Sequence, residues 1–206
     1  MLHPALRPAA SILDPTLTYT VSAYQTAAGT VDIMSHTLEG YFTNKPGGYL
    51  QCRMAEGLLR TCIHYGPIAL AKPDDYEARA NLMWAGSWAL EGVLRLGQAV
   101  PSTVHPIEHQ LSAYYDVTHA AGLAVLTPAW MDYVLSDRTV DKFKEYAVNV
   151  WGVDPALERY QAAQEGIART RRFFIDLKMP TTLRELGIGT EKFAVMAENC
   201  LLYTSG

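Results

Sequence analysis

The chain has 206 residues, of which 49% are hydrophobic and 18% are charged, and its net charge is −4 with a sequence pI ≈ 5.8. These are the values of a globular protein with a core of its own, and the length fits one large domain or two small ones. The balance of charge is acidic and the sequence contains no basic tract. Nucleic acid and anionic membrane surfaces are therefore not expected as partners.

The three cysteines, Cys52, Cys62 and Cys200, are odd in number and form no CxxC motif. This usage predicts free thiols in a reducing compartment. No run of the sequence approaches the roughly 18 apolar residues that a membrane-spanning helix needs. Prolines interrupt the N-terminal residues, where a secretory signal would need an unbroken apolar run. We therefore expect a cytoplasmic protein without a membrane partner.

In chain order, residues 1–21 are predicted to form an extended hinge segment, in which residues 17–21 have the chemistry of a short strand. From residue 22 onwards the pattern indicates helix almost throughout, so the predicted class is all-α, with about seven helices. The predicted helices cover residues 22–42, 49–70, 74–96, 105–115, a stretch after 118, 139–151, 154–177 and a last one from about 191. Pro128 is expected to kink or interrupt the helix that follows residue 118.

Three of the six histidines lie within residues 104–122, at His105, His109 and His119. Because Pro106 disfavours a helical conformation for the residue before it, His105 is predicted to cap a helix. His109 then lies one turn further along on the same side, and His119 lies at the start of the next helix. Imidazole is a common ligand of transition metals and the usual acid or base near neutral pH. Each histidine alone is also compatible with an ordinary interior or surface position.

Asp32 and His36 stand four residues apart in the first predicted helix, so their side chains lie on one face. The rest of that stretch is apolar, and an ionised carboxylate there needs a partner. Either a metal ion or a simple hydrogen bond between the two side chains would meet that need. Together the sequence offers one carboxylate and three imidazoles that suit Fe(II), Zn(II) or a similar divalent ion, from Asp32, His36, His105 and His119.

These residues resemble a motif of the iron-containing (group III) alcohol dehydrogenases. The family pattern G-x-D-x-x-x-H-x-x-E reads here as GTVDIMSHTLEG, with Gly29 one place further from the aspartate. The family pattern H-x3-H-x9-H is matched in full and is followed by Gly122. By this resemblance, the metal ligands are Asp32, His36, His105 and His119.

The resemblance extends over about residues 11–197. Residues 13–20 and 56–90 are similar to the butanol dehydrogenase and broad aldehyde reductase branch. The implied fold is the helical metal-binding domain of the dehydroquinate synthase-like fold, at residues 22–197. The family's N-terminal α/β cofactor domain, with its GGGS-type loop, has no counterpart in the sequence. We therefore expect a C-terminal fragment, with residues 198–206 as an irregular tail that need not be native.

For the intact enzyme, the resemblance implies reversible hydride transfer between NAD(P)H and a small aldehyde or primary alcohol. The expected metal is iron first, with zinc, nickel or manganese left open, and the main NAD(P) site is expected on the missing domain. His109 lies outside the ligand set and is expected to act beside the nicotinamide or as a proton relay. Alternatively, it orients one of the ligands. Glu39, on the same helix face as Asp32, is a second residue that could support a ligand. The resemblance leaves a homodimer open.

Two other functions remain open at this point. The chain could be a helical metal-binding module without redox activity, or an inert remnant, because it contains no glycine-rich phosphate loop. Metal-assisted hydrolysis is less favoured, since helical phosphohydrolases place an adjacent His-Asp pair on a helix and this sequence has none. For these 206 residues alone we expect weak or no dehydrogenase activity, because the cofactor domain is missing.

Overall fold

The computed structural model describes residues 8–42, 47–96 and 103–204, and in these ranges it contains helices and no strand. The all-α prediction is therefore confirmed. The α-helices are α1 (Ala23–Tyr41), α2 (Tyr49–Ala71), α3 (Tyr76–Leu90), α4 (Val104–Tyr115), α5 (His119–Val134), α6 (Val140–Trp151), α7 (Arg159–Asp176) and α8 (Phe193–Thr204). Short 3-10 helices are η2 (Pro15–Thr18), η3 (Val93–Arg95) and η4 (Arg184–Leu186).

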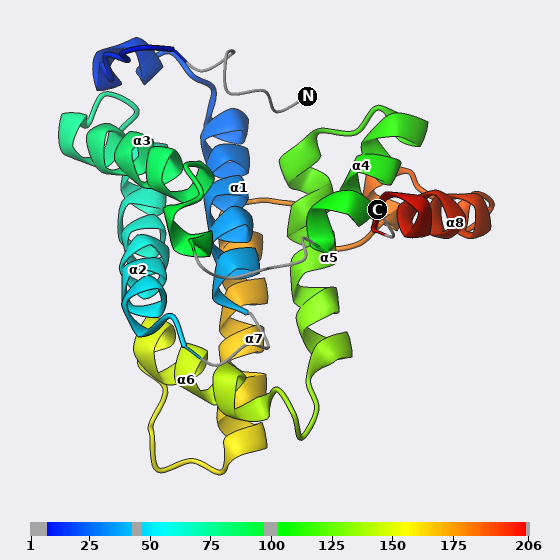
Figure 1. Ribbon diagram of the computed structural model, residues 1–206. Coiled ribbons are helices and arrows are strands. Elements are labelled where there is room, and N and C mark those ends of the chain that lie inside the picture. Colours follow the sequence, from blue (N-terminus) through cyan, green and yellow to red (C-terminus); the bar gives the residue numbers. More distant parts are fainter. Residues whose placement is uncertain (1–7, 43–46, 97–102, 205–206) are drawn as a thin grey trace.

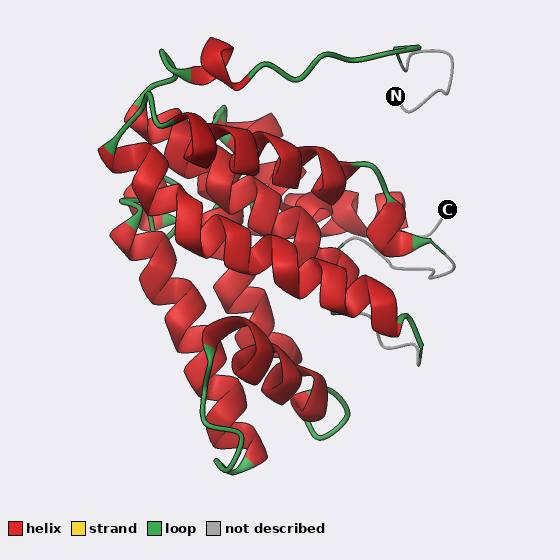
Figure 2. Ribbon diagram, turned by 90° about the vertical axis from the view of Figure 1, so that its left-hand side faces the viewer, coloured by secondary structure: helices red, strands yellow, loops and turns green. Residues whose placement is uncertain are grey.

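Helix α1 occupies the middle of the bundle (Figure 1). It packs against α2 and α3 on one side and against α5 on the other. Helices α6 and α7 pair closely at one end, and α4 lies on α5 with α8 against its outer side. The view turned by 90° shows several of these helices running side by side, with the loops at their ends (Figure 2). Residues of α1 are therefore held from both sides by other helices.

One main hydrophobic core joins these helices. Its members come from almost every element, and fully buried examples are Met34, Leu59, Leu123, Phe143 and Ile167. Full burial of each such side chain contributes about 1.5–3 kcal/mol relative to exposure. The core fixes α1 as a rigid element on which functional side chains can be placed.

The expectation of strand-like structure at residues 17–21 is wrong, because residues 17 and 18 belong to η2 and residues 19–21 form a turn and a bend. Asp14 Oδ1 accepts hydrogen bonds from the backbone N–H of Thr16 at 3.0 Å and from its hydroxyl at 2.7 Å. Pro15 takes the first helical position, where its fixed φ suits a helix and its missing N–H costs nothing. This local capping outweighs the β propensity of the residues that follow.

Some helix boundaries also differ from the predictions, and α3 ends at Leu90 instead of residue 96. Helix α5 continues through Pro128 to Val134, so the expected interruption is absent. Helix α7 begins at Arg159, because the Glu158 carboxylate accepts the first backbone N–H groups and acts as the N-cap. At the C-terminal end, residues 198–204 belong to α8, where an irregular tail is expected from the sequence. Met196 docks α8 through a small apolar cluster that includes Leu111 of α4.

Cys52 and Cys62 are free thiols, as predicted. Cys52 and Cys62 are buried, and burial raises the pKa of the Cys62 thiol to about 12. Within the part of the chain that the structure describes, no helix combines the length and the apolar character needed to cross a membrane.

The contact between α6 and α7 leads to a first prediction. A Cβ added at Gly166 would lie 2.7 Å from the Ala147 Cβ and 3.1 Å from the Ala147 Cα. Because Cα belongs to the backbone and cannot rotate away, Gly166→Ala should destabilise the fold by about 1–3 kcal/mol. Thermal unfolding followed by circular dichroism measures this loss as a lower Tm.

The matched control for this substitution is Gly57→Ala in α2, where no atom outside the local helix backbone lies within 4 Å of the added Cβ. Alanine is favoured over glycine inside a helix, so this variant should be neutral or more stable by up to about 1 kcal/mol. Equal Tm values for the two variants would contradict the close approach of α6 and α7.

Candidate metal centre

The first two residues of the centre come from consecutive turns of α1. Asp32 and His36 are four residues apart, and the Asp32 Oδ1 lies 3.5 Å from the His36 Nε2. Their side chains therefore share one face of α1, as predicted from the spacing. The pair makes no hydrogen bond that satisfies Oδ1. The structure therefore does not contain the direct Asp32–His36 hydrogen bond that the spacing also allowed.

The other two residues come from the starts of α4 and α5. His105 Nε2 lies 3.7 Å from the Asp32 Oδ1, and His119 Nε2 lies 3.8 Å from the same oxygen. The ring centroids of His36 and His105 are 4.0 Å apart, and those of His105 and His119 are 5.3 Å apart. The structure thus brings three Nε2 atoms around one carboxylate oxygen, with side chains from three helices.

The geometry of part of this cluster fits a divalent cation: ligand atoms of Asp32, His36 and His105 lie within 4.8 Å of one another, and His119 joins them through its distance to Asp32 alone. Asp32 Oδ1 and His105 Nε2 are buried and have no hydrogen-bond partner among the described residues, which is costly for polar atoms. Ligand atoms that each lie about 2.1 Å from a shared ion are separated from one another by roughly 3–3.5 Å. The distances of 3.5–3.8 Å from Oδ1 to the three Nε2 atoms are close to this range. A carboxylate with three imidazoles suits Fe(II), Zn(II) and related ions.

Glu39 links α1 to the first turn of α4. Its Oε1 accepts hydrogen bonds from three consecutive backbone N–H groups, at 3.0 Å from Thr103, 2.8 Å from Val104 and 3.1 Å from His105. Its Oε2 lies 3.0 Å from the His105 Nδ1 and 3.4 Å from the Arg95 Nη2. The expectation that His105 caps this helix is wrong, because His105 is its second residue and a distant carboxylate does the capping.

Glu108 contacts His119 from α4 and is not among the residues predicted from the sequence. It lies on α4, is 0% exposed, and its Oε2 contacts the His119 Nδ1. Its Oε1 accepts a hydrogen bond of 2.6 Å from the Ser112 hydroxyl. The available signal is that Glu108 lies between two of the three histidines of the motif, but its burial depends on how α4 packs on α5.

Charges within the cluster shift the ionisation of its members. Burial opposes the charge of Asp32, but the neighbouring imidazoles outweigh it and lower the pKa of that carboxyl. Burial also opposes the charge of His105, yet Asp32 and Glu39 raise its pKa to about 9. Burial and the nearby His105 together lower the pKa of His36. A cation at this point would replace the proton on His105, so its binding would release a proton.

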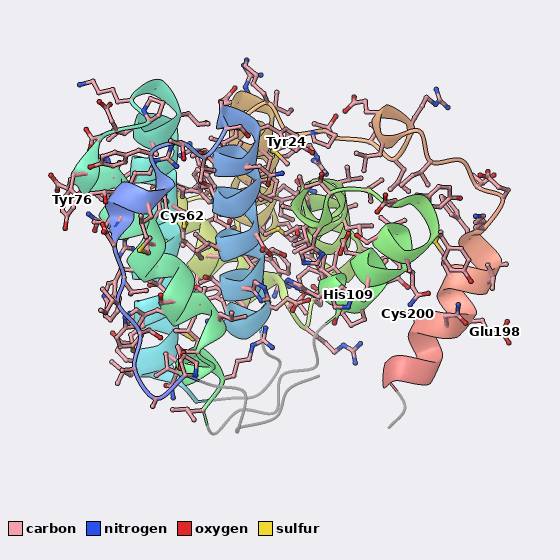
Figure 3. All side chains as sticks on the ribbon, turned by 90° about the horizontal axis from the view of Figure 1, so that it is seen from above. Tyr24, Cys62, Tyr76, His109, Glu198 and Cys200 are labelled. Carbon is pink, nitrogen blue, oxygen red and sulfur yellow. The ribbon has the colours of Figure 1, made fainter. Side chains whose placement is uncertain are left out.

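His109 lies beside the cluster and is exposed. Its ring centroid is 5.4 Å from that of His119, with the rings 29° from parallel, and 6.3 Å from that of His105. Figure 3 shows it on α4, in the region between that helix and α1. His64 is remote from the cluster on α2, with its ring against Tyr65.

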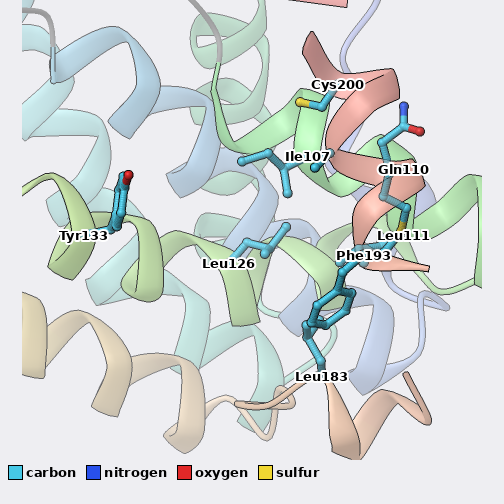
Figure 4. A pocket seen from close by; sticks show the side chains of 10 residues that line it. Ile107, Gln110, Leu111, Leu126, Tyr133, Leu183, Phe193 and Cys200 are labelled. Atoms are coloured by element: carbon cyan, nitrogen blue, oxygen red, sulfur yellow. The ribbon is translucent and has the colours of Figure 1, made fainter. Parts of the chain in front are cut away.

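A separate apolar cavity of ≈ 600 Å³ lies between α4, α5 and α8 (Figure 4). Ile107, Leu111 and Leu126 line it from α4 and α5, and Phe193 and Met196 line it from α8. None of the four clustered residues takes part in its lining. The chemistry of the centre is therefore on the other face of α4.

An all-helical bundle with a carboxylate and three imidazoles at one point defines a class of metal-binding domain. Residues 26–204 match the C-terminal part of the Fe-containing alcohol dehydrogenase family. The chain belongs to that family, which confirms the resemblance seen in the sequence.

Curated relatives agree with this assignment. NADH-dependent butanol dehydrogenase B of Clostridium acetobutylicum is 57% identical over 205 residues, which are 99% of this chain and 53% of that protein. NADPH-dependent aldehyde reductase YqhD of Escherichia coli is 39% identical over 89% of this chain and 47% of that protein. The chain therefore spans about half the length of the curated relatives it matches.

Solved structures share the fold. The crystal structure of NADH-dependent butanol dehydrogenase A from Thermotoga maritima matches with a TM-score of 0.89 and 36% identity, over 97% of this chain and 50% of that one. The substrate- and cofactor-free aldehyde reductase YqhD matches with a TM-score of 0.87 and 35% identity, over 96% and 51% respectively. The predicted fold class, the helical domain of this family, is thereby confirmed.

The contacts of Glu39 lead to a second prediction. Glu39→Ala leaves three backbone N–H groups at the start of α4 without their acceptor. A buried donor without a partner costs about 1–3 kcal/mol, so the variant should lose roughly 2–4 kcal/mol of stability after partial hydration. Thermal or urea unfolding of the metal-free chain measures the loss.

Glu39→Gln keeps one side-chain oxygen as an acceptor and should lose less. Glu198→Ala, which removes an exposed carboxylate from α8, is the control and should change stability by no more than about 0.5 kcal/mol. If Glu39→Ala behaved like this control, Glu39 would not be the cap of α4.

Proposed function

We propose that this chain is the metal-binding half of an alcohol dehydrogenase or aldehyde reductase, which transfers hydride between NAD(P)H and a small aldehyde or primary alcohol. The observation that carries the proposal is that Asp32, His36 and His105 offer ligand atoms within 4.8 Å of one another, with His119 Nε2 3.8 Å from the same Asp32 oxygen. Membership of the iron-containing family supports it, as do relatives whose names state butanol dehydrogenase and aldehyde reductase activity.

In this proposal, the four convergent side chains hold one divalent ion, with iron as the first candidate. Zinc, nickel and manganese are further candidates, because the same nitrogen and oxygen donors accept them. When bound, such an ion supplies Lewis-acid polarisation of a carbonyl oxygen. Asp32 contributes negative charge, and the three imidazoles contribute neutral donors once His105 has lost its proton. His119 and His36 are partly exposed, so the cluster is open to a small molecule on that side.

His109 is proposed to act at the open side of the centre. Its ring is exposed and nearly parallel to that of His119, at 5.4 Å between centroids. From there the imidazole could orient the nicotinamide or carry a proton between the site and solvent. The main NAD(P) site is proposed to lie outside these 206 residues, in the part of the family's proteins that the chain does not match.

The third prediction concerns metal content. The anaerobically purified chain should contain about one divalent ion, and Asp32→Ala and His105→Ala should each lose it, because both atoms that they remove face the same point. Elemental analysis by mass spectrometry measures the ratio. His64→Ala, which removes an exposed imidazole remote from the centre, is the matched control and should retain the ion.

A folded wild-type chain that takes up no ion under these conditions would overturn the proposed metal site and favour a helical remnant without redox function. Loss of the ion in His64→Ala as well would point to non-specific binding. His109→Ala should retain the ion, since His109 is not among the residues that face Asp32.

A fourth prediction separates binding from turnover. The 206-residue chain alone should reduce butanal with NADH or NADPH weakly or not at all, even when loaded with iron, because the hydride donor needs a site of its own. Cofactor oxidation followed at 340 nm is the measurement. Turnover equal to that of a full-length relative would show that these helices bind the nicotinamide cofactor unaided.

A further inference from the structure

The carboxylate of Glu108 contacts the ring of His119 and is itself held in place by other groups. Glu108 is the only carboxylate that contacts His119 Nδ1 in the described part of the chain, and it is 0% exposed. Its second oxygen is held by the Ser112 hydroxyl at 2.6 Å, one turn further along α4. With both oxygens engaged, the carboxylate has little freedom to rotate. A buried carboxylate without such partners would be strongly disfavoured.

We propose that Glu108 is a positioning residue that fixes the tautomer and the ring orientation of His119 and thereby sets the affinity of the centre for its metal ion. This inference rests on the proposed function. When the carboxylate accepts a hydrogen bond from the Nδ1–H of His119, the proton is fixed on Nδ1 and the lone pair remains on Nε2. That Nε2 is the atom 3.8 Å from the Asp32 Oδ1.

His105 also has a carboxylate beside its second nitrogen, although the two groups make no hydrogen bond. Its Nδ1 lies 3.0 Å from Glu39 Oε2, and its Nε2 faces Asp32 at 3.7 Å. His105 and His119 therefore each have a buried carboxylate next to Nδ1, from α1 for His105 and from α4 for His119. Carboxylates that hold the second nitrogen of a ligand histidine typically change metal affinity by about 10–100-fold.

Gly122 provides the room for Glu108. A Cβ at Gly122 would lie 2.7 Å from the Glu108 Cγ and 2.8 Å from its Oε1. Glycine inside a helix costs about 0.5–1 kcal/mol relative to alanine, and Gly122 lies in the first turns of α5. The close approach of the buried carboxylate explains why a side chain is excluded at this position. The buried position of the Glu108 side chain on α4 therefore depends on the missing side chain of Gly122 on α5.

A second metal ion is the competing interpretation of the same residues. Glu108, His109 and His119 offer three ligand atoms within 4.8 Å of one another. The structure favours a support, because Glu108 Oε2 and His119 Nδ1 already contact each other and Ser112 holds the remaining oxygen. The proposal therefore predicts one ion per chain, whereas the competing interpretation predicts two.

The test is a titration of the metal-free, full 206-residue chain with Co²⁺, followed by visible absorption. Glu108→Gln removes the negative charge and Gly122→Ala displaces the carboxylate, so each should weaken Co²⁺ binding by about 10–100-fold and alter the absorption bands. Glu56→Gln is the matched control, because Glu56 is also a buried carboxylate but is hydrogen-bonded by Tyr41, Asn149 and Arg53, away from the histidines. It should leave the affinity and the spectrum unchanged, as should Gly57→Ala.

A second readout needs no metal. Nitrogen-15 NMR of the histidine side chains should show His119 as the Nδ1–H tautomer in the wild type and a mixture of tautomers in Glu108→Gln. If Glu108→Gln or Gly122→Ala does not fold, as judged by circular dichroism, Ser112→Ala replaces it. That variant frees one oxygen of Glu108 and should weaken Co²⁺ binding by a few-fold.

Unchanged affinity, spectrum and tautomer in the Glu108 and Gly122 variants, with one ion bound to the wild type, would overturn the positioning role. Two ions per wild-type chain would overturn it in favour of a second metal site. A wild-type chain that binds no Co²⁺ would contradict the proposed function instead. The tautomer of His119 in the metal-free chain would then still decide whether Glu108 orients it.

Discussion

The centre depends on one carboxylate, that of Glu39, which joins two helices that are distant in the sequence. It accepts hydrogen bonds from three backbone N–H groups at the start of α4, where the N–H groups have no acceptor within the helix itself. The same carboxylate lies against the Nδ1 of His105. Because Glu39 follows Asp32 and His36 on α1, the helix that carries half of the centre also determines where the helix with His105 begins. A shift of α1 would therefore move both parts together.

The charges around the centre explain why a cation suits it. Asp32, Glu39 and Glu108 bring three carboxylates into one poorly hydrated region, and Arg95 offers one compensating charge beside Glu39. With neutral imidazoles, a divalent ion would bring the sum close to zero. Without the ion, protonation of an imidazole supplies part of the missing charge, which is consistent with the raised pKa of His105. Buried charges persist in proteins when they are balanced in this way.

The rest of the bundle keeps α1 in place. Its C-terminal end is tied to α2 by the hydrogen bond of 2.8 Å from the Tyr41 hydroxyl to Glu56, and Asn149 of α6 donates to the same carboxylate at 3.0 Å. The hydrophobic core holds the sides of α1 against α2, α3 and α5. The proposed ligands are thus carried by firmly packed helices, which can hold their geometry without an ion.

The sequence by itself determined the helical class and the shared face of Asp32 and His36, and it supplied the four candidate ligands of the centre, because these follow from periodicity, from i,i+4 spacing and from motif spacing. It did not determine that Glu39 caps α4, that Glu108 is buried behind His119, or that Gly122 must lack a side chain. Those facts depend on how α1, α4 and α5 approach one another. The errors at η2 and at the start of α7 have a related origin: local capping outweighed propensity. Local spacing fixes which side chains share a helix face, whereas only tertiary packing decides which buried groups meet across helices.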